Sequence, residues 1–263
     1  MKIIVCVKQV PDTTNVRINQ KTGTMEREGV PAMVNPYDLY AVEEALRIKE
    51  QHGGSVTALS MGPPQVQEAL REVISMGVDE ASLLTDRAFA GADTLATSYT
   101  LARGLEKIGE FDLIFCGKQA VDGDTAQVGP ELAEHLDLPF IGFVRRIRDV
   151  RPGFICAERM TDEGADVVES PLPAVVSVVK EINEPRLPSL RGKMRAKKFE
   201  APLWTAADIG VDAKRIGLPG SPTWVARSFT PEPRGRGEIL DGEDSSVLAL
   251  ELARKIKGLG VCT

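Results

Sequence analysis

The chain has 263 residues, of which 43% are hydrophobic and 27% are charged, and its formal net charge is -6 with an isoelectric point near 5.2. This length suits one large α/β domain with an appendage, or two small domains. An acidic chain is a poor partner for nucleic acid, because duplex binding depends on cations that neutralise phosphates. No apolar run is long enough for a membrane span or a signal-peptide core, so the sequence predicts a cytoplasmic protein without membrane insertion.

Metal and nucleophile chemistry have little support in the side chains present. The four cysteines are scattered and form no C-x-x-C pair, so they predict neither a zinc site nor a redox dithiol. Cys6 and Cys116 fall in predicted strands, where we expect small buried side chains. The two histidines, His52 and His135, fall in predicted helices and are expected to have surface or capping roles. Histidine-based metal binding and Ser-His-Asp chemistry are therefore not predicted.

The first half of the chain alternates apolar runs typical of buried strands with segments of helical periodicity. Predicted strands cover residues 3–7, 56–61, 81–84 and 113–116, and predicted helices start near residues 36, 65, 93 and 125–128. Asn35 is the expected N-cap of the first helix, with Pro36 at its first position and Asp38 in its first turn, and Asp93 is the expected cap of the third. This βαβ rhythm predicts an α/β fold with a doubly wound, mostly parallel sheet.

After Pro139 the pattern changes. Residues 144–149, 154–159 and 166–169 predict a small antiparallel addition, and the β-branched run 173–179 predicts a return to the main sheet. We expect residues 1–215 to form the α/β domain. Residues 216–263 form a Pro- and Gly-rich arm that ends in an amphipathic helix at 245–260, and this arm cannot build a core of its own. Its apolar stripe therefore needs another surface, in this chain or in a partner.

The segment from Gly117 to Gly129 follows the fourth predicted strand and leads into a helix. Pro130 must lie in the first turn of that helix, since it would break a helix interior. A glycine-bearing turn at a helix N-terminus offers unpaired N–H groups and the positive end of the helix dipole to a phosphate. The segment matches neither G-x-G-x-x-G nor the Walker A pattern, so an ordinary strand-to-helix turn remains the alternative at this point.

The loops that follow the four parallel strands should converge on one crevice, because ligands of such sheets bind beyond the carboxyl ends of the strands. These loops carry glycines that allow close backbone approach, hydroxyls that can donate to phosphate or ring atoms, and carboxylates that can accept from a ribose. The hydroxyls belong to Thr94, Thr97 and Thr125, and the carboxylates to Asp122 and Asp124. This chemistry suits a nucleotide, although each threonine taken singly is more typical of a cap or a turn.

The segment 184–199 is basic and turn-rich in an otherwise acidic chain, and it carries Leu190 and Met194, which we expect to be exposed. A run of charge is usually a solvated face. Exposed apolar side chains within it favour a docking surface.

Four separated motifs resemble, in order, the β subunit of electron-transferring flavoproteins. They are VCVKQVPD at residues 5–12, NPYD at 35–38 with AVEEA at 41–45, GKQA at 117–120, and the stretch 190–198. The likeness covers essentially the whole chain. It implies a fold like the adenine-nucleotide hydrolases and a heterodimer with a larger α subunit, across which the C-terminal arm reaches. It also implies electron transfer through FAD between dehydrogenases and an acceptor.

The resemblance implies binding residues as well. The cofactor-binding residues would be Cys6, Asn35, Pro36, Tyr37, Asp38, Met61, Asp93, Thr94, Thr97, Gly117, Lys118, Gln119, Ala120, Val121, Asp122, Gly123, Asp124, Thr125, Ala126, Gln127 and Val128. Phosphates would rest on backbone N–H groups between Gly123 and Val128, and a flavin ring would lie toward Asp93, Thr94 and Thr97. No side chain need act as a catalytic acid or base, because the redox chemistry belongs to the cofactor.

The resemblance also implies that the basic segment 184–199 is the family's recognition loop, which docks onto an acyl-CoA dehydrogenase or a similar flavin dehydrogenase. Leu190 would be its anchoring apolar residue, with Arg191, Lys193 and Met194 beside it.

The family divides into two kinds. Housekeeping members keep AMP in the β crevice as a structural ligand, whereas electron-bifurcating members place a second FAD there and accept a hydride from NADH. Residues 91–98, 122–131, 228–231 and 237–239 resemble the bifurcating kind. The resemblance therefore favours FAD, NADH as electron donor, and ferredoxin or flavodoxin as low-potential acceptor, with AMP in the same site as the alternative.

A stand-alone enzyme that hydrolyses nucleotides or transfers adenylyl groups is the rival from another class. It has no support in the sequence, since neither a phosphate loop with a catalytic lysine nor an acidic metal cluster is evident.

Overall fold

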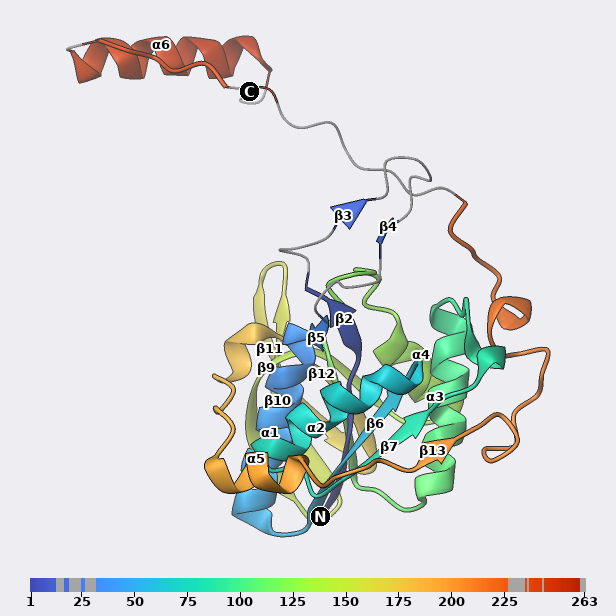
Figure 1. Cartoon of the computed structure of the whole chain (residues 1–263). Coiled ribbons are helices and arrows are strands. Elements are labelled where there is room, and N and C mark those ends of the chain that lie inside the picture. Colours follow the sequence, from blue (N-terminus) through green and yellow to red (C-terminus); the bar gives the residue numbers. More distant parts are fainter. Residues whose placement is uncertain are drawn as a thin grey trace. The chain divides into compact units, whose positions relative to one another are not determined.

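The structure is a computed structural model that describes residues 1–12, 17–18, 25–26, 32–226, 235, 237–242 and 244–260 (Figure 1). The chain divides into two compact units, Met1–Ser228 and Phe229–Thr263. Two features noted in the sequence, residues 228–231 and Cys262, lie outside the described residues. None of the helices in the described ranges is both long and apolar enough to cross a membrane.

A nine-stranded sheet forms the centre of the first unit (Figure 1). Its strand order is β11-β10-β9-β12-β8-β1-β6-β7-β13. Consecutive parallel pairs join β1 (Lys2–Cys6), β6 (Ser55–Met61), β7 (Glu80–Leu84), β8 (Leu113–Gly117), β12 (Ala174–Val178) and β13 (Leu203–Trp204). The predicted α/β class with a mostly parallel sheet is confirmed.

The predicted antiparallel addition is also present, with strands longer than expected. It consists of β9 (Phe140–Arg151), β10 (Phe154–Thr161) and β11 (Gly164–Pro171). β9 joins the main sheet by pairing parallel with β12. Two small ladders were not predicted, because strands of two or three residues give no periodic signal. They pair β2 (Gln9–Pro11) with β5 (Ala32–Val34), and β3 (Arg17–Ile18) with β4 (Met25–Glu26).

Helices cover both faces of the sheet. α1 (Pro36–His52), α2 (Gln67–Met76) and α5 (Leu190–Ala196) pack on one face, and α3 (Thr94–Ile108) and α4 (Val128–Leu136) pack on the other (Figure 1). β1 shows why: Ile3 and Val5 belong to the first core, and Ile4 and Cys6 belong to the second. Successive strand residues point to opposite faces, so a continuous apolar run requires helices on both sides.

Single turns of 3-10 helix connect several of these elements. They are η2 (Pro64–Val66), η3 (Arg87–Phe89), η4 (Lys180–Ile182) and η5 (Leu218–Gly220). The predicted helix at 65–76 is therefore a 3-10 turn followed by α2.

The prediction of a turn-rich loop at 184–199 is wrong at its centre, where residues 190–196 form α5. Ser189 caps this helix, since its Oγ accepts from the Gly192 N–H at 3.0 Å. A Cβ atom on Gly192 would lie 2.0 Å from the carbonyl oxygen of Ser75, the penultimate residue of α2. The short helix thus depends on a close tertiary contact that the local sequence does not show.

The first unit continues past residue 215, since Ile216 is buried in the second core. In the second unit, α6 (Ser245–Gly258) starts at the predicted residue, and the Asp244 carboxylate accepts from the Ser246 N–H at 2.8 Å. Among the described residues of its own unit, α6 buries none of its side chains. Among its described residues, Leu248 is partly buried and the other apolar side chains are exposed.

Candidate nucleotide-binding site

The strand order reverses at β1. From β1 the chain continues through β6 and β7 on one side of the sheet, and it later places β8 and β12 on the other. At the carboxyl ends of β1 and β8, Cys6 lies opposite Cys116, and both are buried as predicted. In open α/β sheets this switch point is where a ligand crevice forms. Lys8, after β1, and the loop after β8 both lie at this edge.

Asn35 ties the first turn of α1 to the loop after β8. Its Nδ2 donates to the Gln119 carbonyl at 2.9 Å, and its Oδ1 accepts from the Val121 N–H at 3.1 Å. Asn35 is the N-cap residue of α1, as predicted, although its side chain makes no cap hydrogen bond. Pro36 occupies the first helical position as expected. Asn35 therefore fixes the loop instead of the helix end.

Asp38 lies beneath the same turn and is almost fully buried. Its carboxylate accepts from the Lys8 N–H at 2.8 Å, from Asn35 Nδ2 at 2.9 Å and from the Gly117 N–H. Burial raises the pKa of Asp38 to about 7, although these three donors and the Lys8 cation act in the opposite direction. The carboxyl group is thus an internal bridge from β1 and β8 to α1, and not only a charge placed at a helix N-terminus.

Gly117 makes that bridge possible. A Cβ atom at this position would lie 2.4 Å from Asp38 Oδ1 and 2.6 Å from the Tyr37 carbonyl carbon. Such distances are far inside normal contact, so no side chain fits between β8 and α1. The glycine at the end of β8 is required by packing within the chain.

We call residues 117–128 the cradle. Its turn is closed by the Ala120 carbonyl, which accepts from Gly123 N–H at 3.3 Å and from Asp124 N–H at 2.8 Å. Asp124 and Ala126 adopt left-handed backbone conformations, with φ of 54° and 55°. Non-glycine residues held there cost on the order of 1 kcal/mol each, a strain that is typical of functional sites.

The last part of the cradle leads directly into α4. The first helical hydrogen bond at this end runs from Glu131 N–H to the Gln127 carbonyl at 3.1 Å. Among the residues that the structure describes, none accepts from the backbone N–H groups of residues 125–128. Donors at a helix N-terminus after left-handed residues form an anion-binding concavity. The backbone is thus suited to a phosphate where the sequence predicts one.

Side chains brace the cradle from two directions. Lys8 Nζ lies 2.6 Å from Asp122 Oδ1, and Gln119 Nε2 donates to Asp124. From α3, the Thr94 hydroxyl lies 3.1 Å from Gln127 Oε1. Contacts within the chain therefore already engage the side chains of three predicted binding residues, Asp122, Asp124 and Gln127.

Two residues of this bracing lie outside the predicted binding set. Lys8 pairs with the cradle, and Glu131 lies 3.0 Å from the Thr94 hydroxyl through Oε1. The sequence could have identified Lys8 as a site residue, because it follows β1 at the carboxyl edge of the sheet. It offers no such signal for Glu131, because an acidic residue in the first turn of a helix is common.

The residues expected on the flavin side lie at the start of α3, whereas Met61, expected at the adenine nucleotide, lies at the end of β6. Asp93 caps α3 as predicted, accepting from Ala96 N–H at 3.1 Å, and also accepts from Thr223 N–H and Oγ1 at 3.1 and 2.9 Å. Its carboxylate is committed to these contacts. Met61 ends β6 and Thr97 lies in the first turn of α3, and within the described ranges neither hydrogen-bonds to the cradle.

The predicted docking residues are brought together by α5. Leu190 is 79% exposed and Met194 is 63% exposed, as expected for a contact surface without its partner. Arg191 and Lys193 lie exposed on the same helix. An apolar pair with a cationic rim is typical of a docking site for a partner with an acidic surface.

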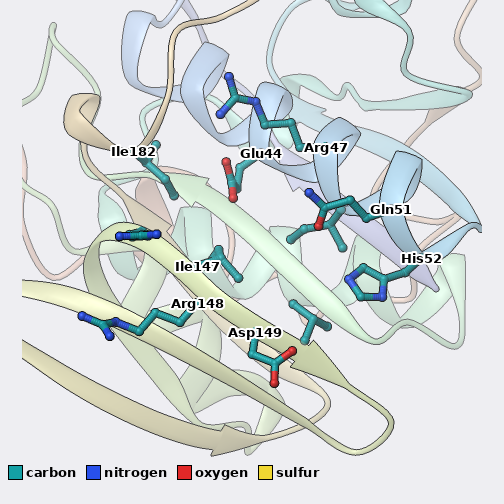
Figure 2. A pocket seen from close by; sticks show the side chains of 11 residues that line it. Glu44, Arg47, Gln51, His52, Ile147, Arg148, Asp149 and Ile182 are labelled. Atoms are coloured by element: carbon teal, nitrogen blue, oxygen red, sulfur yellow. The ribbon is translucent and has the colours of Figure 1, made fainter.

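A cavity of about 420 Å³ lies elsewhere, between the second half of α1 and β9 (Figure 2). The cavity is lined from α1 by Glu44, Arg47, Gln51 and His52, and from β9 by Ile147, Arg148 and Asp149. It contains none of the predicted binding residues. Its arginines are largely committed, since Arg148 pairs with Glu158 at 2.6 Å and Arg47 with Glu43 at 2.9 Å. The cradle is therefore a better candidate for a nucleotide site than this cavity.

In the part of the chain that is described, no group of three or more His, Cys, Asp or Glu side chains is arranged to hold an ion.

The raised pKa of Asp38 predicts a pH-dependent stability. The neutral form is favoured in the folded state, so its contribution is fully present below about pH 4 and is lost as the pH rises to about 7. Three pKa units correspond to about 4 kcal/mol. Between pH 4 and 7 we expect the free energy of unfolding of the wild type to fall by about 4 kcal/mol relative to that of Asp38→Asn, which carries a neutral isostere. Urea unfolding of both proteins across this range measures the difference, and parallel pH profiles would contradict the prediction.

Comparisons with known proteins identify the family of the chain. Residues 22–209 match the family model described as electron transfer flavoprotein domain. The chain is 50% identical over 241 residues to the electron transfer flavoprotein subunit beta of Clostridium acetobutylicum, covering 92% of each chain. It is 47% identical to subunit CarD of the caffeyl-CoA reductase-Etf complex of Acetobacterium woodii, covering 98% of each. It is 46% identical to protein FixA of Azotobacter vinelandii, covering 93% of this chain and 90% of that one.

The family model spans residues 22–209, which include the cradle and α5, and the relatives from Clostridium acetobutylicum and Acetobacterium woodii match 92% and 98% of this chain. The protein belongs to the electron transfer flavoprotein family, as a β subunit.

Proposed function

We propose that this β subunit binds FAD in the crevice between β1 and β8 and takes part in electron bifurcation. A hydride from NADH would enter at this flavin. One electron would pass to a low-potential acceptor such as ferredoxin or flavodoxin, and the other, through the FAD of an α subunit, to an acyl-CoA-type dehydrogenase. The observation that carries the proposal is the cradle, where left-handed Asp124 and Ala126 precede unpaired N–H groups at the start of α4.

The chain's own contribution is to bind and orient the cofactor. FAD supplies the hydride and single-electron chemistry when bound. The N–H groups of residues 125–128 would hold the diphosphate, because they are directed donors reinforced by the dipole of α4. Gly123 leaves room for it, since a Cβ there would meet no atom of the chain within 4 Å. The residues present therefore fit a nucleotide phosphate.

The adenosine end would lie against the turn that Asn35 and Asp38 build. The Asn35 amide holds the cradle at Gln119 and Val121, so that the donors keep their positions without the ligand. A preorganised site spends less of the binding free energy on ordering loops. The predicted contacts with Cys6, Tyr37 and Met61 belong to this proposal.

Two observations favour FAD over AMP in this site. Residues 91–98 and 122–131 resemble the bifurcating members, and α3 meets the cradle there through Thr94. The relatives also include CarD, whose name places it in a caffeyl-CoA reductase-Etf complex. A housekeeping β subunit that holds AMP structurally is the second candidate, because a single phosphate would use the same N–H groups.

The nucleotide content of the purified heterodimer tests the proposal. Release of the bound nucleotides by denaturation, followed by chromatography and mass spectrometry, should give two FAD and no AMP per heterodimer. One FAD with one AMP would overturn bifurcation and keep the cradle. Turnover of ATP by the isolated chain without flavin or partner would overturn electron transfer itself.

Gly123 allows a graded test of the cradle. Gly123→Ala and Gly123→Val fill open space without a clash inside the chain, so folding should be preserved. Because the added atoms occupy the approach to the phosphate, nucleotide occupancy should fall slightly with Ala and severely with Val. Occupancy is measured from the amount of released nucleotide. Thermal unfolding followed by far-ultraviolet circular dichroism serves as the folding control. Full occupancy in Gly123→Val would place the phosphate elsewhere.

Leu190 allows a test of partner docking. Leu190→Glu puts a charge at the centre of an apolar contact and should cost at least about 2 kcal/mol, or roughly thirtyfold in affinity for the dehydrogenase. Oxidation of NADH by a small artificial acceptor should be unchanged. Val167→Glu, at an exposed apolar residue on β11, is the matched control. Equal loss of both activities in Leu190→Glu would show that α5 has a structural role.

A further inference from the structure

The segment that precedes α5 is clamped to α1 by one arginine. We call residues 183–189 the strap. Arg186 Nε donates to Glu43 Oε2 at 2.7 Å, and Nη2 donates to Glu43 Oε1 and Glu50 Oε2, each at 3.1 Å. The backbone N–H of Arg186 also donates to Glu43 at 3.1 Å. A planar guanidinium matches two carboxylates in this way, whereas a lysine ammonium cannot form the fork.

The clamp is anchored in the interior at Glu43, whereas its second carboxylate, Glu50, is exposed. The Glu43 side chain is only 4% exposed, and it also accepts from Arg47 Nε at 2.9 Å. At the start of the strap, Asn183 Nδ2 donates to Glu44 Oε2 and to the Tyr40 carbonyl, each at 3.0 Å. Buried, multiply bonded charge pairs hold geometry far better than exposed ones.

Other contacts hold α5 itself. Its N-terminus is capped by Ser189, Gly192 packs against Ser75, and Arg195 Nη1 donates to the Val78 carbonyl at 2.9 Å. None of these reaches residue 187. The position of Leu187 is therefore set between the Arg186 clamp on one side and the Ser189 cap on the other.

Leu187 is the most exposed of three apolar side chains near this helix. It is 89% exposed, and Leu190 and Met194 follow at intervals of three and four residues. Residues at this spacing share one face where the backbone is helical, and Leu187 lies just before that face begins. Five hydrogen bonds fix the preceding residue, Arg186, while Leu187 itself is exposed. An exposed apolar side chain on a fixed backbone is typical of a contact with a partner.

We propose that Arg186 is a positioning residue that presents Leu187 beside Leu190, so that the docking surface consists of Leu187, Leu190 and Met194. This inference rests on the proposed docking role of α5. The partner site that fits it is an apolar pocket with an acidic rim, because cations on α5 surround the three side chains. Without the clamp the strap would have to be ordered at the moment of binding, at a cost in affinity.

A double-mutant cycle on the heterodimer tests the inference. The variants are Arg186→Ala, Leu187→Asp and the two together, and the probe partner is a purified acyl-CoA dehydrogenase. Ordering one or two backbone residues on binding should make Arg186→Ala bind about ten- to a hundredfold more weakly. Because Arg186 acts through Leu187, the double variant should bind no more weakly than Leu187→Asp alone. Arg186→Lys should lie between wild type and Arg186→Ala.

Hydrogen exchange of the free heterodimer supplies a second readout. Amides of the strap should exchange faster in Arg186→Ala, while those of α5, the bound nucleotide and NADH oxidation by a small acceptor stay unchanged. Arg151→Ala, which removes a surface pair with Asp149, is the matched control and should change neither affinity nor exchange.

Three outcomes would overturn the inference. They are unchanged affinity in Arg186→Ala, additive losses in the double variant, and loss of nucleotide or folding in Arg186→Ala. If Leu190→Glu also left the affinity unchanged, the docking role of α5 would itself be wrong. The failure of the inference and of the proposed function are therefore distinguishable.

Discussion

The crevice depends on the close packing of the first turn of α1 against the end of β8, with no side chain between them. Gly117 allows this approach, and Asp38 and Asn35 convert it into directed hydrogen bonds. The loop after β8 is thereby fixed at Gln119 and Val121 before it turns. The cradle therefore begins at a position that contacts in the protein interior determine. Its left-handed residues and unpaired N–H groups come after this fixed beginning.

The same helix connects the cofactor site with the docking surface. α1 begins at the cradle with Pro36 and ends at His52, a rise of about 25 Å. Its first turn holds the cradle, and Glu43, Glu44 and Glu50 further along hold the strap. If the cofactor and the partner bind as proposed, one helix relates the two sites.

Much of the fold is readable from the sequence, because its strands and helices have strong local patterns. The run at 113–116 is apolar throughout, as a strand covered on both faces must be, and it lies within β8. α5 was missed because its helix is made possible by Gly192 against Ser75, a contact between residues more than a hundred positions apart. The ladder of β2 and β5 was missed because three-residue strands have no period.

The site is only partly readable for the same reason. Asn35 matches a local cap preference, yet its two partners in the cradle lie more than eighty residues further along the chain. The sequence predicts the cradle as a segment, since glycine, proline and a following helix are local signals, but it does not show which N–H groups remain unpaired. The contacts of Asp93, Thr94 and Thr97 with a flavin, and that of Met61 with the adenine nucleotide, remain predictions.

A crystal structure of the heterodimer with its bound nucleotides tests the central claim most directly. The account predicts phosphate oxygens within hydrogen-bond distance of the N–H groups of residues 125–128, with Asp124 and Ala126 still left-handed and the Asn35 contacts to the loop intact. A nucleotide phosphate bound away from the cradle, with those N–H groups facing solvent, would contradict it.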